Sequence, residues 1–274
     1  MLYDALDSVF LAVADLETAG QPYGRLGMRL SPAQAGRRSL SVGQAHNRFA
    51  VHFIVVPGSP PLLAESWQRA QATDRGLFAV ALRVADLDLT LAALAARGVQ
   101  SAARTGLEAW LSLQDQAGTD LVLVPQARSP QERHTEAVQE SLLGHSFPLK
   151  RLDHLAVVAH DLEGKTRFWT EVLGVPVAGE VVTPTMVIRQ LKIGDAVLEL
   201  LGPASPDSPL QQRPPGLVSM VSWEVEDLAE AVRQARAGGF TAPETVQGVL
   251  PGTRTATIPG TELVGVNMQL LEYA

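Results

Sequence analysis

The stretch "RLDHLAVVAHDLEGKTRFWTEVLGVPV" (residues 151–177) shows the plan on which this chain is built. Its first part contains "HLAVVA", a continuous apolar run with the length of a buried strand. Asp161 can then cap a helix, because its carboxylate can accept hydrogen bonds from the free amide groups of the first turn. Gly174 supplies the left-handed residue that ends such a helix. The stretch therefore predicts a strand followed by a helix of about three turns.

The same signal occurs four times, which indicates internal duplication. Each copy reads V-x-D-L after a strand-like run, with one inserted residue in the third copy. The four aspartates are separated by 71, 75 and 66 residues, and a glycine follows each of them after 12 or 13 residues. The aspartate and glycine pairs are Asp15 and Gly27, Asp86 and Gly98, Asp161 and Gly174, and Asp227 and Gly239. Asp227 with Glu230 also fits a capping box.

Stretches rich in strand-forming residues follow each predicted helix, so that each copy reads β-α-β-β-β. Such a unit exposes one apolar face of its sheet, and pairing two units can bury that face and curve the sheets around a cleft. We therefore predict an α+β fold with four units paired into two modules of curved mixed sheets. The modules are expected at residues 1–126 and 151–274, with a linker at 127–150 that contains a short helix near 131–143.

Length, charge and composition limit the classes of protein. A chain of 274 residues is long enough for two domains, and the net charge of −7 argues against a nucleic-acid partner. The absence of cysteine excludes disulfides and thiolate chemistry. No apolar run approaches the roughly 20 residues needed to cross a bilayer. The start, "MLYDALDSV", carries acids where a signal peptide has a basic region, so we expect a cytoplasmic protein without membrane contact.

The β-α-β-β-β unit, with His154 in its first strand, V-x-D-L and a helix ending in "EVLGVPV", resembles the vicinal-oxygen-chelate superfamily. That superfamily includes glyoxalase I, methylmalonyl-CoA epimerase, bleomycin-resistance proteins and extradiol dioxygenases. The resemblance covers nearly the whole chain as two tandem modules. It is strongest in 151–203 and 216–272 and weak in 20–75, and the C-terminal module is most similar to methylmalonyl-CoA epimerase and glyoxalase I. These motifs are specific for the fold and poorly specific for the activity.

The resemblance implies a metal site in the C-terminal module. In metal-dependent members, the first and last strands of each unit give one ligand each, and the metal acts as a Lewis acid on two substrate oxygens. His154 and Glu199 match two of these positions, while Met220 stands where a histidine is expected and Gln269 where a glutamate is expected. The metal candidates are therefore His154, Glu199 and Gln269, with manganese, cobalt, nickel, zinc or iron as the ion. A thioether is a poor ligand for such ions, so the cofactor stays open.

Glu199 requires an explanation because a carboxylate inside "VLELL" is costly to bury unless it is paired, coordinated or protonated. One interpretation is an ion pair with Arg189, Lys192 or Arg254. The other is a base or ligand that faces the cleft, in which case Glu199 is the catalytic candidate that carries a proton. His154 is likewise either a metal ligand or a strand histidine that bonds to the backbone or to Glu199.

The N-terminal module departs further from the metal pattern. Ser8 and Ala79 stand at the two first-strand positions, and Val122 stands at one of the last-strand positions. His52 lies near the remaining position. One histidine with small or apolar neighbours cannot form a metal site, so this module is expected to be structural or to hold a second pocket.

Two functions are favoured, and a third is open. The first is a small-molecule-binding protein, similar to the resistance proteins, that holds an oxygenated or apolar ligand in the C-terminal cleft without a full metal site. The alternative is a metal-dependent isomerase or lyase that acts through an enolate intermediate. The third is a structural or regulatory partner protein whose modules bind nothing. Whichever function holds, the protein is expected to be a monomer with internally paired units or a homodimer. The residues expected to line the cleft or fill the core are Met186, Met220, Trp223 and Met268.

Overall fold

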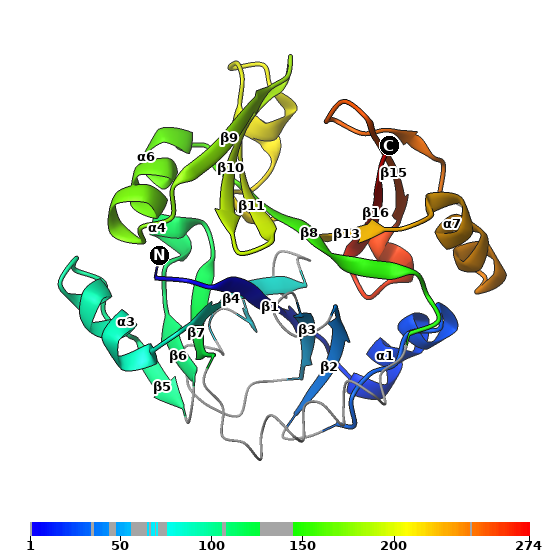
Figure 1. Ribbon diagram of the computed structural model, residues 1–274, viewed down its shortest axis with the longest axis horizontal. Helices are drawn as coiled ribbons and strands as arrows, with labels where there is room; N and C mark the ends of the chain where they lie inside the picture. Colours follow the sequence, from blue (N-terminus) through cyan, green and yellow to red (C-terminus); the bar gives the residue numbers. More distant parts are fainter. Residues whose placement is uncertain are drawn as a thin grey trace.

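The computed structural model of this chain contains two curved mixed sheets with few helices (Figure 1). It describes residues 2–33, 36–43, 48–55, 65, 67–68, 70, 76–105, 108–126, 145–241 and 243–274. Both sheets mix parallel and antiparallel pairs, as expected for an α+β fold built from duplicated units. No helix in these ranges is long and apolar enough to span a membrane.

The N-terminal sheet has seven strands in the order β2-β3-β1-β4-β7-β6-β5. The antiparallel pair of β1 and β4, the first strands of units one and two, joins the two units. The strands are β1 (Ala5–Ala12), β2 (Arg37–Val42), β3 (Phe49–Ile54), β4 (Leu77–Val84), β5 (Ala103–Thr105), β6 (Glu108–Leu111) and β7 (Asp120–Pro125). The helices are α1 (Leu16–Arg25), α3 (Leu87–Ala95) and α4 (Gln114–Ala117).

The C-terminal sheet has nine strands in the order β14-β15-β16-β13-β8-β11-β10-β9, with β12 beside β8. Its strands are β8 (Leu149–Val158), β9 (Val177–Val182), β10 (Met186–Ile193), β11 (Ala196–Pro203), β12 (Gly216–Leu217), β13 (Met220–Val225), β14 (Val246–Gln247), β15 (Thr253–Ile258) and β16 (Asn267–Tyr273). Its helical segments are α6 (Leu162–Arg167), η2 (Phe168–Val172), η3 (Pro209–Gln212), α7 (Leu228–Ala237) and η4 (Gly260–Glu262). Here too the first strands of two units, β8 and β13, pair antiparallel, and each has the last strand of its own unit in parallel beside it.

The helix signals predicted from the sequence are confirmed in all four units. Each capping aspartate accepts a hydrogen bond from the backbone amide three residues later, and each following glycine has a positive φ. The caps are Asp15, Asp86, Asp161 and Asp227, and the glycines are Gly27, Gly98, Gly174 and Gly239. The predicted capping box at Asp227 does not form. The Glu230 carboxylate accepts hydrogen bonds from Arg233 and Gln234 instead of turning back to the backbone amide of Asp227.

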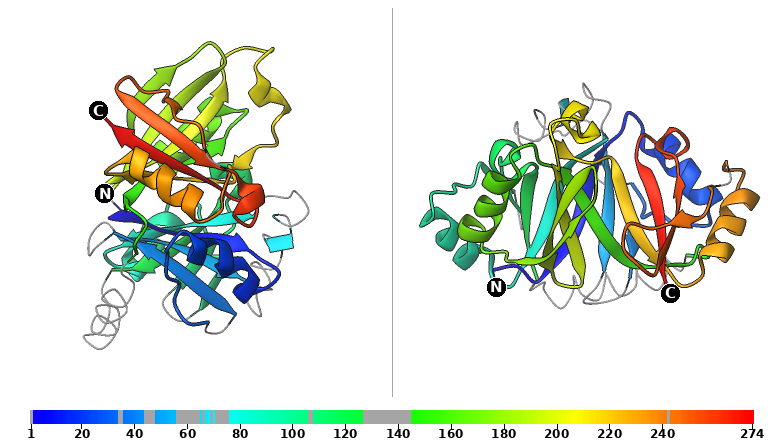
Figure 2. Two further views of the ribbon diagram at one scale, coloured as in Figure 1. Left: turned by 90° about the vertical axis from the view of Figure 1, so that its right-hand side faces the viewer. Right: turned by 90° about the horizontal axis from the view of Figure 1, so that it is seen from above.

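The two sheets pack back to back through their central strands, while α6 and α7 flank the outer sides of the C-terminal sheet (Figures 1 and 2). The ring of Trp223 on β13 lies 5.8 Å from that of Phe49 on β3, both nearly completely buried. A second contact joins the two halves: the Arg25 guanidinium at the end of α1 lies 4.7 Å from the centre of the Phe240 ring, which follows α7. The opposite face of the C-terminal sheet therefore turns away from the N-terminal half and forms its concave side.

The first sheet ends at Pro125 and the second begins at Leu149. The linker at 127–150, with its short helix near 131–143, falls largely outside the described ranges. Within it, His145 accepts a hydrogen bond from the Arg29 amide at 3.0 Å and contacts the Ser41 carbonyl at 2.6 Å, which ties this part of the chain to the N-terminal half. The boundaries at 126 and 151 remain a prediction.

Candidate functional site on the C-terminal sheet

The pairing of β8 with β11 brings His154 and Glu199 to one face of the sheet. In this parallel pair, Val197 is the partner of His154 and Glu199 is the partner of Ala156. Because alternate residues of a strand share a face, His154 and Glu199 are diagonal neighbours. Nε2 of His154 lies 3.9 Å from Oε2 of Glu199, and each side chain is 13% exposed. The two residues predicted to act together are thus adjacent and mostly buried, with a small part of each side chain exposed on the concave side.

The outer atoms of this pair are held by neighbouring side chains. Nδ1 of His154 lies 2.7 Å from Oδ1 of Asp153, and Nε2 of Gln190 donates a hydrogen bond of 3.0 Å to Oε1 of Glu199. Of the basic partners considered for Glu199, Arg189 and Arg254 pair with other glutamates. Glu199 therefore accepts a hydrogen bond from an amide and faces an imidazole, and it is not paired with either arginine.

The charges around His154 favour its protonated form. Burial disfavours the charged imidazole, but the hydrogen bond to Asp153 and the negative charges of Glu199 and Asp153 outweigh burial and raise the pKa of His154. For Asp153, burial is likewise outweighed, here by His154 and by a hydrogen bond from Tyr273, and its pKa is lowered. The site thus holds a buried imidazole between two carboxyl groups.

The second half of the site comes from β13 and β16. Ser222 is the partner of His154 across the antiparallel pair and of Gln269 across the parallel pair. The Ser222 hydroxyl donates a hydrogen bond of 2.8 Å to Oε1 of Gln269. Gln269 therefore lies on the His154 face, as predicted, with Ser222 between the two. Met220, two residues before Ser222, shares this face.

The predicted lining residues separate into two groups. Met186 lies on the same side of β10 as Gln190, the partner of Glu199, so Met186 and Met220 belong to the concave face. Trp223 and Met268 follow Ser222 and precede Gln269, respectively, and so point to the opposite face. They are 1% and 3% exposed and serve the core.

Comparison with known protein families bears on this half of the chain. Residues 151–256 match the family described as Glyoxalase/Bleomycin resistance protein/Dioxygenase superfamily. This segment belongs to that superfamily. The resemblance stated from the sequence is therefore confirmed for the C-terminal half.

Two curated relatives of this superfamily segment are mitochondrial methylmalonyl-CoA epimerases. The Mus musculus protein is 36% identical over 92 residues, which make up 31% of this chain and 52% of the relative. The Homo sapiens protein is 30% identical over 115 residues, which make up 39% of this chain and 65% of the relative. The match thus spans about half to just under two thirds of the length of these relatives.

A solved structure extends the likeness in fold to the whole chain. A triple mutant of 4-hydroxymandelate synthase from Streptomyces coelicolor matches 100% of this chain and 93% of its own, with a TM-score of 0.66 and 15% identity. At this identity the match shows a shared fold and does not indicate a shared reaction. The predicted tandem arrangement of curved mixed sheets is thereby confirmed.

The donor set is only partly suited to the divalent metal that the superfamily resemblance implies. Within the described ranges, no group of three histidine, aspartate, glutamate or cysteine side chains is arranged to hold a metal ion. His154 and Glu199 are suitable donors, but Gln269 already accepts the Ser222 hydrogen bond and Met220 offers only a thioether. These side chains do not fit a complete four-ligand site.

The corresponding face of the N-terminal sheet carries an apolar cluster in place of metal ligands. Ser8 and Val122 both pair with Ala81, and Phe10 pairs with both Ala79 and His52. Nδ1 of His52 lies 2.7 Å from the Ser39 hydroxyl. His52 thus has a hydrogen-bonding partner and packs against the ring of Phe10, with 5.0 Å between the ring centres.

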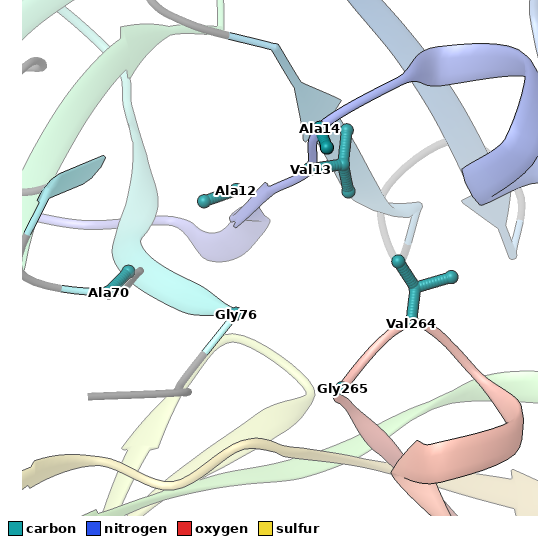
Figure 3. Close-up of a pocket in the computed structure, with 7 residues that line it drawn as sticks. All are labelled: Ala12, Val13, Ala14, Ala70, Gly76, Val264 and Gly265. Carbon is teal, nitrogen blue, oxygen red and sulfur yellow. The ribbon is translucent and has the colours of Figure 1, made fainter. Parts of the chain in front are cut away.

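A pocket of about 250 Å³ lies where the two halves meet, away from His154 and Glu199 (Figure 3). It is lined by Ala12, Val13, Ala14, Ala70, Gly76, Val264 and Gly265. Its lining has small apolar side chains and backbone groups but no titratable side chain. This pocket therefore offers no acid, base or metal ligand of its own.

Four residues of the site were not predicted from the sequence: Asp153, Gln190, Ser222 and Tyr273. Gln190 and Ser222 could have been found by alternation, because they lie opposite Glu199 and two residues after Met220. Asp153 and Tyr273 gave no comparable signal, since their positions depend on how the strands pair.

Proposed function

We propose that this protein binds a small oxygenated molecule on the concave face of its C-terminal sheet, without a complete metal site. The observation that carries the proposal is the 3.9 Å separation between Nε2 of His154 and Oε2 of Glu199. This distance is too long for a hydrogen bond between them. It is short enough for one ligand hydroxyl to accept from the imidazole and donate to the carboxylate.

The neighbouring hydrogen bonds support such a bridging role. Asp153 occupies Nδ1 of His154, and Gln190 occupies Oε1 of Glu199. The atoms left for a ligand are therefore one donor and one acceptor on adjacent strands. A ligand group with both a proton and a lone pair, such as an alcohol, satisfies the two together.

The rest of the face adds apolar contact and further polar groups. Met220 and Met186 are half-buried on this side and offer flexible side chains that adapt to a ligand. Gln269 adds an amide group, whose Oε1 accepts a hydrogen bond from the buried Ser222 hydroxyl. A molecule with a hydroxyl at one end and an apolar part at the other matches this distribution.

The binding proposal is tested with a panel of small 2-hydroxy acids and aliphatic diols, each at several concentrations, by thermal melts. A ligand that binds the folded state raises the melting temperature with concentration. We expect at least one of these compounds to do so, and Glu199→Gln to reduce the shift. Glu171→Gln, at an exposed position of η2, is the matched control. No shift with any compound, or an equal shift in Glu199→Gln, would refute the proposal.

A metal-dependent isomerase or lyase is the second candidate, and two observations favour it. The curated relatives are epimerases, and a carboxylate on the second ring nitrogen of a histidine is typical of metal-ligating histidines. This function would use His154, Glu199 and Gln269 as ligands and Glu199 as proton carrier, and it would require a further donor. Metal analysis of the purified protein, with melts in Mn²⁺, Co²⁺, Ni²⁺ and Zn²⁺, distinguishes the two. A bound metal and a metal-induced shift that Glu199→Ala removes would favour the isomerase or lyase.

A further inference from the structure

The pairing of β8 with β13 is irregular at Asp153. Ser222 is the partner of His154, but the next residue of β13, Trp223, is the partner of Leu152. Asp153 is thus an extra residue on its strand, which is the arrangement of a β-bulge. A bulge interrupts alternation and re-aims a side chain. Here it allows the Asp153 carboxylate to reach the ring of its own neighbour, His154, at 2.7 Å.

The Asp153 carboxylate has a second partner on β16. The Tyr273 hydroxyl donates a hydrogen bond of 2.7 Å to Oδ2, while Oδ1 faces Nδ1 of His154. Asp153 is only 7% exposed, and a carboxylate so buried must be hydrogen-bonded on both sides to remain charged. Tyr273 lies on the same side of its strand as Gln269. The strand that presents Gln269 therefore also supports Asp153.

These contacts determine which nitrogen of His154 is available. An ionised carboxylate only accepts hydrogen bonds, so the proton between Asp153 and His154 belongs to Nδ1. Nε2 is then left toward Glu199, 3.9 Å away. Burial and the hydrogen bond to Asp153 raise the pKa of Tyr273, which keeps its hydroxyl a donor. The Tyr273 hydroxyl and Nδ1 of His154 therefore both donate to the Asp153 carboxylate, one to each of its oxygens.

We propose that Asp153 and Tyr273 are positioning residues of the ligand site, which fix the ring of His154 so that Nε2 faces the ligand beside Glu199. Taking His154 as a ligand contact rests on the proposed function. The orientation of the His154 ring is a property of the protein without ligand. The orientation and the ligand contact can therefore be tested in separate experiments.

The orientation is tested by NMR of the full chain labelled with ¹⁵N in its histidines, without added ligand. The Nδ1 proton of His154, identified by its loss in His154→Gln, is expected to be shifted downfield and protected from exchange. Asp153→Asn is expected to move this resonance and the ring ¹⁵N shifts. Asp207→Asn, an exposed aspartate with the same chemical change, should leave them unchanged.

Tyr273→Phe is the second variant. It removes only the hydroxyl of a residue that is 46% exposed, so this variant should still fold. It is expected to shift the same resonance by a smaller amount and to weaken binding of any hydroxy compound found by thermal melts by about tenfold. If neither Asp153→Asn nor Tyr273→Phe alters the His154 resonance, the positioning role is wrong. If both alter it and no compound binds the wild type, the positioning role stands and the proposed function fails.

Discussion

Met220 and Gln269 occupy the same relative positions on β13 and β16 as His154 and Glu199 occupy on β8 and β11. Gln269 lies two residues beyond Asn267, the partner of Met220, and Glu199 lies two residues beyond the partner of His154. The two pairs therefore occupy equivalent places in the two units of the C-terminal sheet. The difference is chemical, because one pair offers an imidazole and a carboxylate and the other a thioether and an amide.

Restoring metal donors at the second pair should create a metal site. The double variant Met220→His with Gln269→Glu places an imidazole and a carboxylate on the face that already holds His154 and Glu199. At a zinc or nickel concentration of about 100 times Kd, the melting temperature of the variant should rise by about 5 to 10 °C. Differential scanning calorimetry with and without the ions measures this shift.

The wild type serves as the reference for this variant. Its shift with the same ions should be clearly smaller, since the thioether of Met220 and the hydrogen-bonded amide of Gln269 are weak donors. A wild-type shift as large as that of the double variant would show that the natural donor set already suffices.

The sequence was sufficient for the fold because its signals are local. A capping aspartate and a left-handed glycine act within one helix, and all four copies of each adopt the expected geometry. The resemblance likewise predicted that His154 and Glu199 belong to one site. The tandem arrangement followed from the repetition of these signals along the chain.

The rest of the site depends on strand register, which local signals do not encode. Strict alternation places Asp153 on the face opposite His154, and the bulge overrides it. Tyr273 contacts Asp153 across 120 residues of chain. Trp223 and Met268 were grouped with Met220 by composition, although alternation from Ser222 and Gln269 separates them.

The raised pKa of His154 should make stability depend on pH. A group whose pKa is higher in the folded than in the unfolded chain stabilises the protein below its unfolded value, here 6.5. That stabilisation is lost as the pH rises through the folded pKa. We therefore expect the free energy of unfolding of the wild type, minus that of His154→Gln, to be largest near pH 5.5 to 6 and to decrease above pH 6.5. Urea unfolding at several pH values measures it.

Glu199→Gln provides the control for this pH dependence. It removes one of the negative charges that raise the pKa of His154 and leaves the contact with Asp153 in place. The decrease should then be smaller and should end at a lower pH than in the wild type, while it still begins near the unfolded value of 6.5. An identical profile in both proteins would mean that the Glu199 charge does not act on His154.

Gly98, which follows α3, should be required only because its backbone adopts a left-handed conformation. Gly98 has a φ of 84°, and no atom lies within 4 Å of where a Cβ would be placed. Gly98→Ala should therefore cost about 1 kcal/mol from backbone strain without any steric clash. Gly24→Ala, inside α1 and equally open, should instead stabilise the protein by about 0.5 to 1 kcal/mol. Urea unfolding gives both values, and equal signs would contradict the assignment.

Substitutions of Met268 and Met220 should have different effects, because one residue lies in the core and the other on the ligand face. Met268 is 3% exposed and packs in the core, so Met268→Ala should lower the free energy of unfolding by about 2 to 5 kcal/mol. Met220 is half-buried on the concave face, so Met220→Ala should cost clearly less and should weaken the binding of any compound that stabilises the wild type. Urea unfolding and ligand melts of both variants measure these effects. If Met220→Ala were as destabilising as Met268→Ala and left binding unchanged, Met220 would belong to the core and the concave face would lose its apolar contact.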